Sequence, residues 1–198
     1  MESFHKAAPA GIPAQLKPAL GPVLQTLMRV TAQIRKFDKL IESMARCRYS
    51  EAALLRQVKG VGPVTALSFI LTLEDPQRFR KPRAVGAYLG LTPRKDQSGK
   101  RDPQLRITKA GDPFVRRLLV GCAQYILGPF GPDSDLRRWG LRLAAIGGKN
   151  AKKRAVVAVA RKLATLLLSL WRSAQVYEPL GHVPARQHSV TATRAVPA

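Results

Sequence analysis

The sequence predicts a mainly α-helical protein, in which a coiled-coil arm is followed by a compact helical domain. Apolar residues recur every three or four positions along successive segments, and proline, glycine and capping residues divide these segments from one another. A closely spaced glycine pair ahead of a proline also predicts a helix-hairpin-helix within the domain. The expected organisation is a disordered N-terminus (1–18), a coiled-coil helix (19–48), the helical domain (49–178) and a disordered tail (179–198).

The chain is strongly basic. Its 198 residues hold 34 Lys and Arg against 12 Asp and Glu, a net charge of +22. Such self-repulsion predicts an anionic partner, with nucleic acid favoured over an acidic membrane surface. The longest nearly apolar run, 163–171, is too short to span a bilayer, and no signal-peptide pattern is present. Cys47 and Cys122 lack metal-ligand spacing, so we expect two reduced thiols, no metal site and a cytoplasmic protein.

The first helical segment carries a heptad pattern that runs for more than three heptads. Its apolar positions are Leu20, Val23, Leu27, Val30, Ile34, Phe37, Ile41 and Met44. Strict alternation of three- and four-residue steps is typical of a coiled coil, either between chains or in a hairpin. A long helix packed on its own domain is the alternative. We therefore predict a homo-oligomer formed through this segment.

The helix-hairpin-helix is predicted from residues 51–73. Gly60 and Gly62 permit a tight turn, and Pro63 suits the first position of a second helix. In this motif the hairpin N–H groups face a DNA phosphate, and Lys59 would add a positive charge. An ordinary helical hairpin has the same pattern. The surrounding charge favours nucleic-acid binding by Lys59, Gly60 and Gly62.

The remaining helices are delimited by their end signals. Asp75-Pro76 ends the hairpin's second helix, Pro82 and Gly90 bound a short helix, and Gly147-Gly148 separates the last two helices. Asp112 should cap one helix, and Asp133 or Ser134 the next. The predicted inward-facing residues of these last three helices are Phe114, Leu118, Cys122 and Tyr125, then Leu136, Trp139 and Leu143, then Val156, Ala160, Leu163, Leu167 and Trp171. Arg137, Arg138 and Arg142 are predicted to face outward.

The last third of the chain predicts a surface that faces phosphates. Residues 137–177 contain no Asp or Glu, whereas a solvated helix face usually mixes both signs. The predicted nucleic-acid contacts in the helices are Arg117, Lys152, Lys153 and Arg154.

A polar, basic segment, 94–111, connects two helices and is long enough to suggest a function. Ser98 lies in it, followed by a glycine. A serine hydroxyl can attack a DNA phosphorus if cations stabilise the resulting charge, although spacing alone favours a turn residue. The cations around it are Arg94, Lys95, Lys100, Arg101, Arg106 and Lys109. The acidic residues are scattered, which argues against a self-contained metal nuclease.

These motifs together resemble a known family. The residues are Gly60-Val61-Gly62-Pro63-Val64-Thr65-Ala66, 79–86, Tyr88-Leu89-Gly90-Leu91-Thr92-Pro93, Gln97-Ser98-Gly99, and Ile107-Thr108-Lys109-Ala110-Gly111 with Val115-Arg116. Their order resembles the C-terminal transposase domain of the bridge-RNA-guided insertion-sequence transposases (the IS-one-ten and IS-eleven-eleven type). The resemblance covers about residues 50–178, and the heptad segment looks like the coiled coil that precedes this domain.

The resemblance implies DNA transposition by a serine nucleophile that becomes covalently joined to DNA. Ser98 is the matching position. Arg94, Arg106, Lys109 and Arg116 would be the cations nearest the attacked phosphate, with Lys95, Lys100 and Arg101 binding nucleic acid. The resemblance also implies a structured guide RNA, homo-oligomers, and the excision and insertion of a mobile element.

One departure from the family concerns metal binding. The family's N-terminal RuvC-like domain supplies four acidic residues that bind magnesium, and residues 1–19 contain nothing similar. We therefore expect the C-terminal part of a transposase, which binds nucleic acid but is inactive alone. No cofactor is expected in this chain, and magnesium only with the missing domain. The alternatives are a non-enzymatic DNA- or RNA-binding protein and a basic structural protein that binds RNA.

Overall fold

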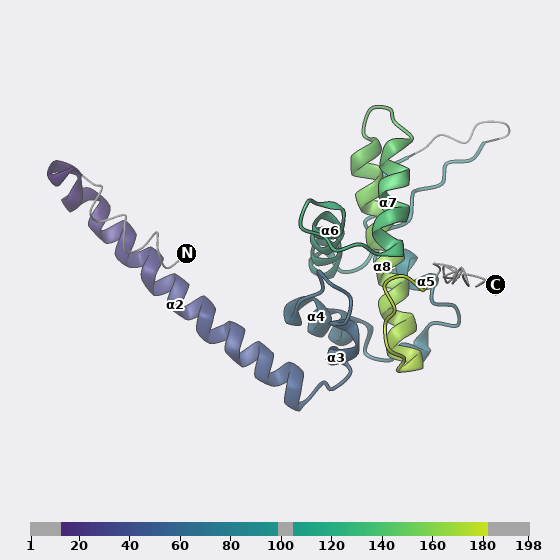
Figure 1. Ribbon diagram of the computed structural model, residues 1–198, viewed down its shortest axis with the longest axis horizontal. Coiled ribbons are helices and arrows are strands. Elements are labelled where there is room, and N and C mark those ends of the chain that lie inside the picture. Colours follow the sequence, from purple (N-terminus) through teal and green to yellow (C-terminus); the bar gives the residue numbers. More distant parts are fainter. Residues whose placement is uncertain (1–12, 99–104, 182–198) are drawn as a thin grey trace, which may run out of the picture. The chain divides into compact units, whose positions relative to one another are not determined.

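The computed structural model describes residues 13–98 and 105–181 (Figure 1). Within these ranges the chain forms seven α-helices and two 3-10 turns and no strand, which confirms the predicted mainly α-helical class. The chain divides into two compact units, one that ends at Ala53 and one that begins at Leu54.

The first unit is dominated by one long helix, α2 (Lys17–Cys47), which follows a 3-10 turn, η1 (Ala14–Leu16). Both begin inside the N-terminus predicted to be disordered, so that prediction is wrong for residues 14–18. Residues 1–12 lie outside the described part. Pro18 stands in the first turn of α2, where a missing N–H is tolerated.

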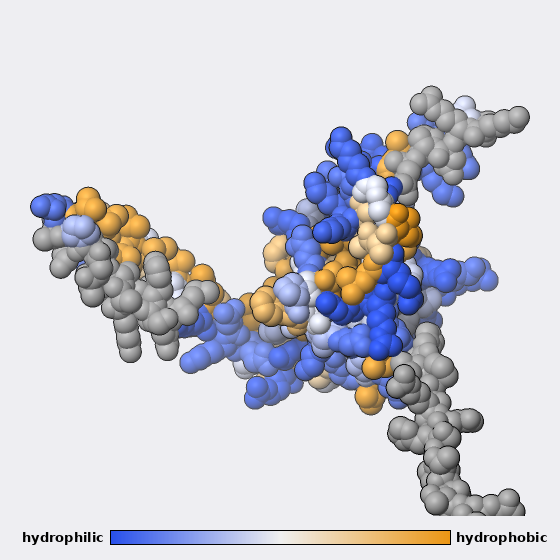
Figure 2. All heavy atoms as spheres, turned by 45° about the horizontal axis from the view of Figure 1, so that its top comes forward, coloured by the Kyte–Doolittle hydropathy of each residue, from blue (hydrophilic) through white to orange (hydrophobic). Residues whose placement is uncertain are grey.

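The heptad positions of α2 are largely exposed. Val30, Ile34 and Phe37 expose 50%, 53% and 57% of their surface, and Figure 2 shows hydrophobic residues gathered along one side of this helix. The structure has one helix, Lys17–Cys47, where the sequence predicted a helix over 19–48. The coiled coil itself stays a prediction, because it needs a second helix against this face.

The second unit is built around the helix α8 (Ala151–Ser173), which packs against α5 (Ala84–Tyr88), α6 (Pro113–Leu127) and α7 (Asp135–Ala145) (Figure 1). It also contacts the 3-10 turn η2 (Pro76–Arg78). The helix α4 (Pro63–Leu73) packs on α6, and the single turn α3 (Ala52–Leu55) precedes it. Among the described helices, none is apolar over a length sufficient to cross a membrane.

The predicted helix ends are confirmed by their caps. Gly62 and Pro63 hold the N-cap and first positions of α4. The Asp112 carboxylate accepts the Val115 N–H at 2.7 Å, and the Ser134 hydroxyl, rather than Asp133, caps α7 by accepting the Arg137 N–H at 3.2 Å. Gly147 and Gly148 have φ of 84° and 88°, values that favour glycine at the break before α8.

The predicted inward faces are only partly correct. In α6, Phe114 and Tyr125 are 46% and 45% exposed, and Cys122 is the one buried residue of the predicted set. The buried residues of α6 are Val115, Leu119, Cys122, Ala123 and Ile126. The predicted residues and the buried residues form neighbouring apolar stripes on α6, so periodicity alone could not identify the buried one.

The last two helices show smaller shifts. Leu136 is buried as predicted, whereas Trp139 and Leu143 are half-buried, and Gly140 is the other buried residue of α7. The α8 core holds Ala160, Leu163 and Leu167 as predicted; Val156 and Trp171 are half-buried. The buried residues that were not predicted in α8 are Ala151, Ala155, Val159, Ala164, Leu168 and Leu170.

Candidate nucleic-acid interface

The glycine hairpin between α3 and α4 has two glycines with different roles. Gly60 has φ of 98°, and a Cβ there would meet the Tyr125 ring at 2.8 Å. Only glycine suits both the conformation and this contact. Gly62 has an ordinary φ of −89°, and a Cβ there would meet nothing within 4 Å. The fold therefore requires Gly60 but has no steric need for Gly62.

The segment that follows α8 is hydrogen-bonded to the residues next to the hairpin and to the start of α7. The Tyr177 N–H donates to the Gln57 side-chain oxygen at 2.6 Å, and the Asp135 N–H donates to the Pro179 carbonyl at 2.8 Å. Val58, Lys59, Tyr177 and Pro179 are among the residues that line a mostly apolar pocket next to these contacts. Lys59 itself is exposed. The hairpin is thus held in place while its charged residue faces solvent.

An open groove lies between the hairpin and α6. It is lined by Gly60, Val61, Gly62, Thr65, Arg117, Leu118, Gly121, Cys122 and Tyr125. The two walls are joined below by Thr65 and Cys122, whose hydroxyl and thiol lie 3.6 Å apart. Burial raises the pKa of the Cys122 thiol above its ordinary value. Three predicted nucleic-acid contacts, Gly60, Gly62 and Arg117, therefore lie together, with Lys59 adjacent in sequence.

The two ends of the segment that contains Ser98 run antiparallel to one another. Pro93 and Ile107 form an isolated bridge, and the Arg94 N–H donates to the Arg106 carbonyl at 2.9 Å. Both arginines are exposed, as are Lys95 and Ser98. The pairing was not predicted. It brings Arg94 and Arg106 opposite one another at the base of the segment. Lys100 and Arg101 lie outside the described residues.

The base of this segment is tightly fixed to the helices. The Arg116 guanidinium donates through Nη1 to the carbonyls of Leu89 (3.1 Å) and Ala110 (2.9 Å). Lys109 has φ of 59°, and its N–H donates to the Gly90 carbonyl. Arg116 is thus half-buried and bound to backbone, where we predicted a phosphate contact. These two hydrogen bonds join the residue after α5 to the end of the segment, and the phosphate contact of Arg116 stays a prediction.

Two further arginines donate hydrogen bonds to backbone carbonyls. The sequence patterns did not indicate these contacts. Arg137 donates to the carbonyls of Ile126 and Gly128, so it faces inward where we predicted an outward residue. Arg172 donates to the Phe79 carbonyl at 3.2 Å. Arg138 does face outward, and its contact with Asp133 lowers the pKa of that carboxyl.

The start of α8 holds a third group of predicted contacts. Lys152, Lys153 and Arg154 are exposed in the first turn, which contains no acidic residue. Cations at a helix N-terminus oppose the helix dipole, so helix stability does not explain this placement. Among the described residues, no group of three or more His, Cys, Asp or Glu side chains could hold a metal ion.

Comparison with known proteins places the middle of this chain in a family of insertion-sequence transposases. Residues 52–135 match the family model described as the Transposase IS116/IS110/IS902 family. This segment contains the hairpin, the groove and the described part of the Ser98 segment. It belongs to that transposase family, which confirms the resemblance found in the sequence.

Individual relatives agree with this assignment. The chain is 28% identical to a probable family 20 transposase of Pseudomonas aeruginosa over 90% of this chain and 52% of the relative. It is 27% identical to the transposase for insertion sequence element IS1111A of Coxiella burnetii, over 84% and 45%. It is 26% identical to a pilin gene-inverting protein of Moraxella lacunata, over 75% and 46%. The chain thus spans about half the length of these relatives.

Proposed function

We propose that this chain is the DNA-binding C-terminal part of an insertion-sequence transposase, with Ser98 as the nucleophile of DNA recombination. The observation that carries the proposal is the family match, because residues 52–135 include both the hairpin groove and Ser98. The name of the pilin gene-inverting relative supports DNA rearrangement as the reaction class.

The proposed reaction is a transesterification at phosphorus. The Ser98 hydroxyl oxygen forms a bond to the phosphorus, the bond to one strand's oxygen breaks, and that oxygen leaves with a proton. Arg94 and Arg106 stabilise the negative charge in the transition state. Like charges directly opposite one another on paired segments are destabilising, so their placement is better explained by a shared anion than by stability.

Magnesium and partners complete the proposal. The magnesium ligands would be the four acidic residues of the RuvC-like domain that the resemblance implies. A structured guide RNA and a second copy of the chain, bound through α2, are the other proposed partners. The described residues of this chain therefore supply the nucleophile, the phosphate contacts and the oligomer contact.

A trapped protein–DNA adduct tests the nucleophile. The chain would be fused to a RuvC-like acidic domain of a relative and incubated with guide RNA, magnesium and both DNA sites. An adduct that survives denaturation is expected, and Ser98→Ala should abolish it while leaving DNA affinity unchanged. Ser173→Ala, at an exposed serine of α8, is the matched control and should form the adduct normally.

An adduct that persisted in Ser98→Ala would assign the chemistry to another hydroxyl. Ser134 is a poor substitute, because it is 8% exposed and its hydroxyl caps α7. Thr92 and Thr108 would then be examined by the same substitution.

A non-enzymatic nucleic-acid-binding protein is the second candidate. It is favoured by the observation that the described residues contain no cluster of acidic side chains. This candidate predicts salt-sensitive DNA or RNA binding and no adduct in the fused protein with all components present.

A further inference from the structure

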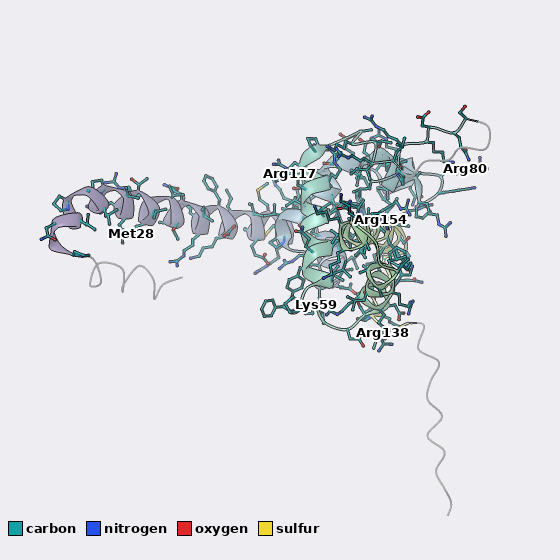
Figure 3. All side chains as sticks on the ribbon, turned by 90° about the horizontal axis from the view of Figure 1, so that it is seen from above. Met28, Lys59, Arg80, Arg117, Arg138 and Arg154 are labelled. Atoms are coloured by element: carbon teal, nitrogen blue, oxygen red, sulfur yellow. The ribbon has the colours of Figure 1, made fainter. Side chains whose placement is uncertain are left out.

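The groove between the hairpin and α6 has a second wall that no sequence motif indicated. The first wall is the hairpin with the start of α4, and the second is the exposed side of α6 around Gly121. Figure 3 shows Lys59 and Arg117 along α6, with Lys59 toward one end of this helix and Arg117 toward the other. Both side chains are exposed.

Two glycines in these walls have no steric role in the fold. Gly121 stands in the middle of α6, where glycine weakens a helix, and a Cβ there would meet nothing within 4 Å. Gly62 has the same open surroundings and an ordinary backbone conformation. By contrast, Gly60 in the same groove is required by its φ and by the Tyr125 ring. Steric need and backbone conformation therefore explain one glycine of the three.

The charge of the groove defines the chemistry of its occupant. None of the residues that line it is acidic, and α4 and α6 contain no Asp or Glu. Arg117 lies in the α6 wall, with its guanidinium 5.8 Å from the centre of the half-exposed Phe114 ring. Arg117 is the one charged residue of the lining and the exposed Lys59 is adjacent in sequence, so the groove favours an anionic occupant that can lie against exposed backbone, as a phosphodiester strand can.

We propose that this groove binds the sugar–phosphate backbone of duplex DNA, with Gly62 and Gly121 allowing the strand to approach both walls. The α6 helix is then part of the DNA interface and not only a support for the hairpin. The buried Thr65–Cys122 contact joins the two walls. The inference rests on the proposed function, because it takes DNA as the ligand.

Neutral side chains placed in the groove test the proposal without changing the net charge. Gly62→Gln and Gly121→Gln should each weaken duplex DNA binding about tenfold or more, because the added side chain keeps phosphates away from the wall. Ala145→Gln adds the same side chain at an exposed position of α7 outside the groove. Its affinity should stay within about twofold of the original protein.

The salt dependence of binding gives a second readout. Arg117→Gln should reduce the slope of log affinity against log salt by about one, the value for one lost phosphate contact. Arg138→Gln, at an exposed arginine already paired with Asp133, should leave that slope unchanged. Thermal unfolding should show Gly121→Gln to be at least as stable as the original protein, because glutamine forms helix better than glycine.

The outcomes separate this inference from the proposed function. If the unmodified protein shows no DNA binding, the proposed function fails. If it binds duplex DNA and both glycine variants bind equally well, the groove inference alone fails. Weakened binding of a stem-loop RNA with unchanged binding of duplex DNA would also overturn it, since RNA would then be the occupant.

Discussion

The two long helices, α2 and α8, have the same kind of apolar pattern but opposite surroundings. In α8 the side chains of Leu163 and Leu167 are fully buried by neighbouring helices of their own unit. In α2 the corresponding side chains of Val30 and Ile34 are about half exposed, at 50% and 53%. Periodicity therefore predicts that a helix has an apolar face, whereas it does not tell whether that face is covered by the same chain or by another.

The largest expected effect of the difference between α2 and α8 is on the stability of the second unit. Leu167→Ala should lower the free energy of unfolding of the second unit by about 2–5 kcal/mol, because it leaves a cavity at a fully buried position. Denaturant unfolding followed by circular dichroism measures this change. Leu71→Ala, at a leucine of α4 that is 52% exposed, is the control and should cost less than about 0.5 kcal/mol. Equal effects of the two substitutions would contradict the assignment of α8 as the core helix.

A charge in the α2 face should change association rather than folding. Ile34→Asp would place a carboxylate in an apolar contact between chains and should dissociate the oligomer, because burying an unpaired charge is costly. Sedimentation velocity at micromolar concentration reports the assembly. Gln25→Asp introduces the same charge at an exposed position outside the heptad residues and should leave the oligomer intact. An unmodified protein that sediments as a monomer would refute association through α2.

Two glycines within helices, Gly140 of α7 and Gly21 of α2, show the same difference in packing between the two units, with smaller expected effects on stability. A Cβ at Gly140 of α7 would meet Val159 at 2.5 Å and Leu127 at 2.7 Å, so Gly140→Ala should destabilise the second unit by about 1–3 kcal/mol. A Cβ at Gly21 of α2 would meet nothing within 4 Å. Gly21→Ala should therefore stabilise the helix slightly, by up to about 1 kcal/mol. Thermal melts of both variants should shift in opposite directions, and a shift in the same direction would be evidence against the difference in packing.

The two cysteines provide the smallest effect, one on reactivity. Cys47 at the end of α2 is exposed, whereas Cys122 is buried and its pKa is raised. A raised pKa leaves less of the reactive thiolate at any pH below it, so Cys122 should react with iodoacetamide only after unfolding. Mass spectrometry at pH 8 should find Cys47 alkylated first. Comparable rates in the folded protein would show that the α6 side of the groove opens readily.

Helix ends were predictable from sequence because single residues determine them. Pro63, Asp112 and Ser134 act within one turn, through a fixed φ or a side chain that accepts a backbone N–H. Each of these signals needs no information about distant residues. The order of helices and most of their boundaries followed from such signals.

The parts that were not predictable depend on contacts between distant segments. Arg116 and Arg137 were expected to face phosphate or solvent, but each guanidinium reaches carbonyls of another segment. The pairing of Arg94 with Arg106 joins polar segments that have no apolar alternation to signal it. In the candidate site, the hairpin glycines could be recognised from sequence. The α6 wall could not be recognised from sequence, because Gly121 and Gly62 are brought into the same groove only by the folded structure.

The hydrogen bond between Tyr177 and Gln57 also has a consequence for synthesis of the protein. It joins residues 120 positions apart, next to the glycine hairpin. A ribosome makes the hairpin early, but residue 177 must leave the exit tunnel before this contact can form. Domains generally fold as units, and the second unit is built around α8 (Ala151–Ser173), so most of this unit must be made before its helices can pack. On the nascent chain, the hairpin thus reaches its final form only after the end of the second unit has been made.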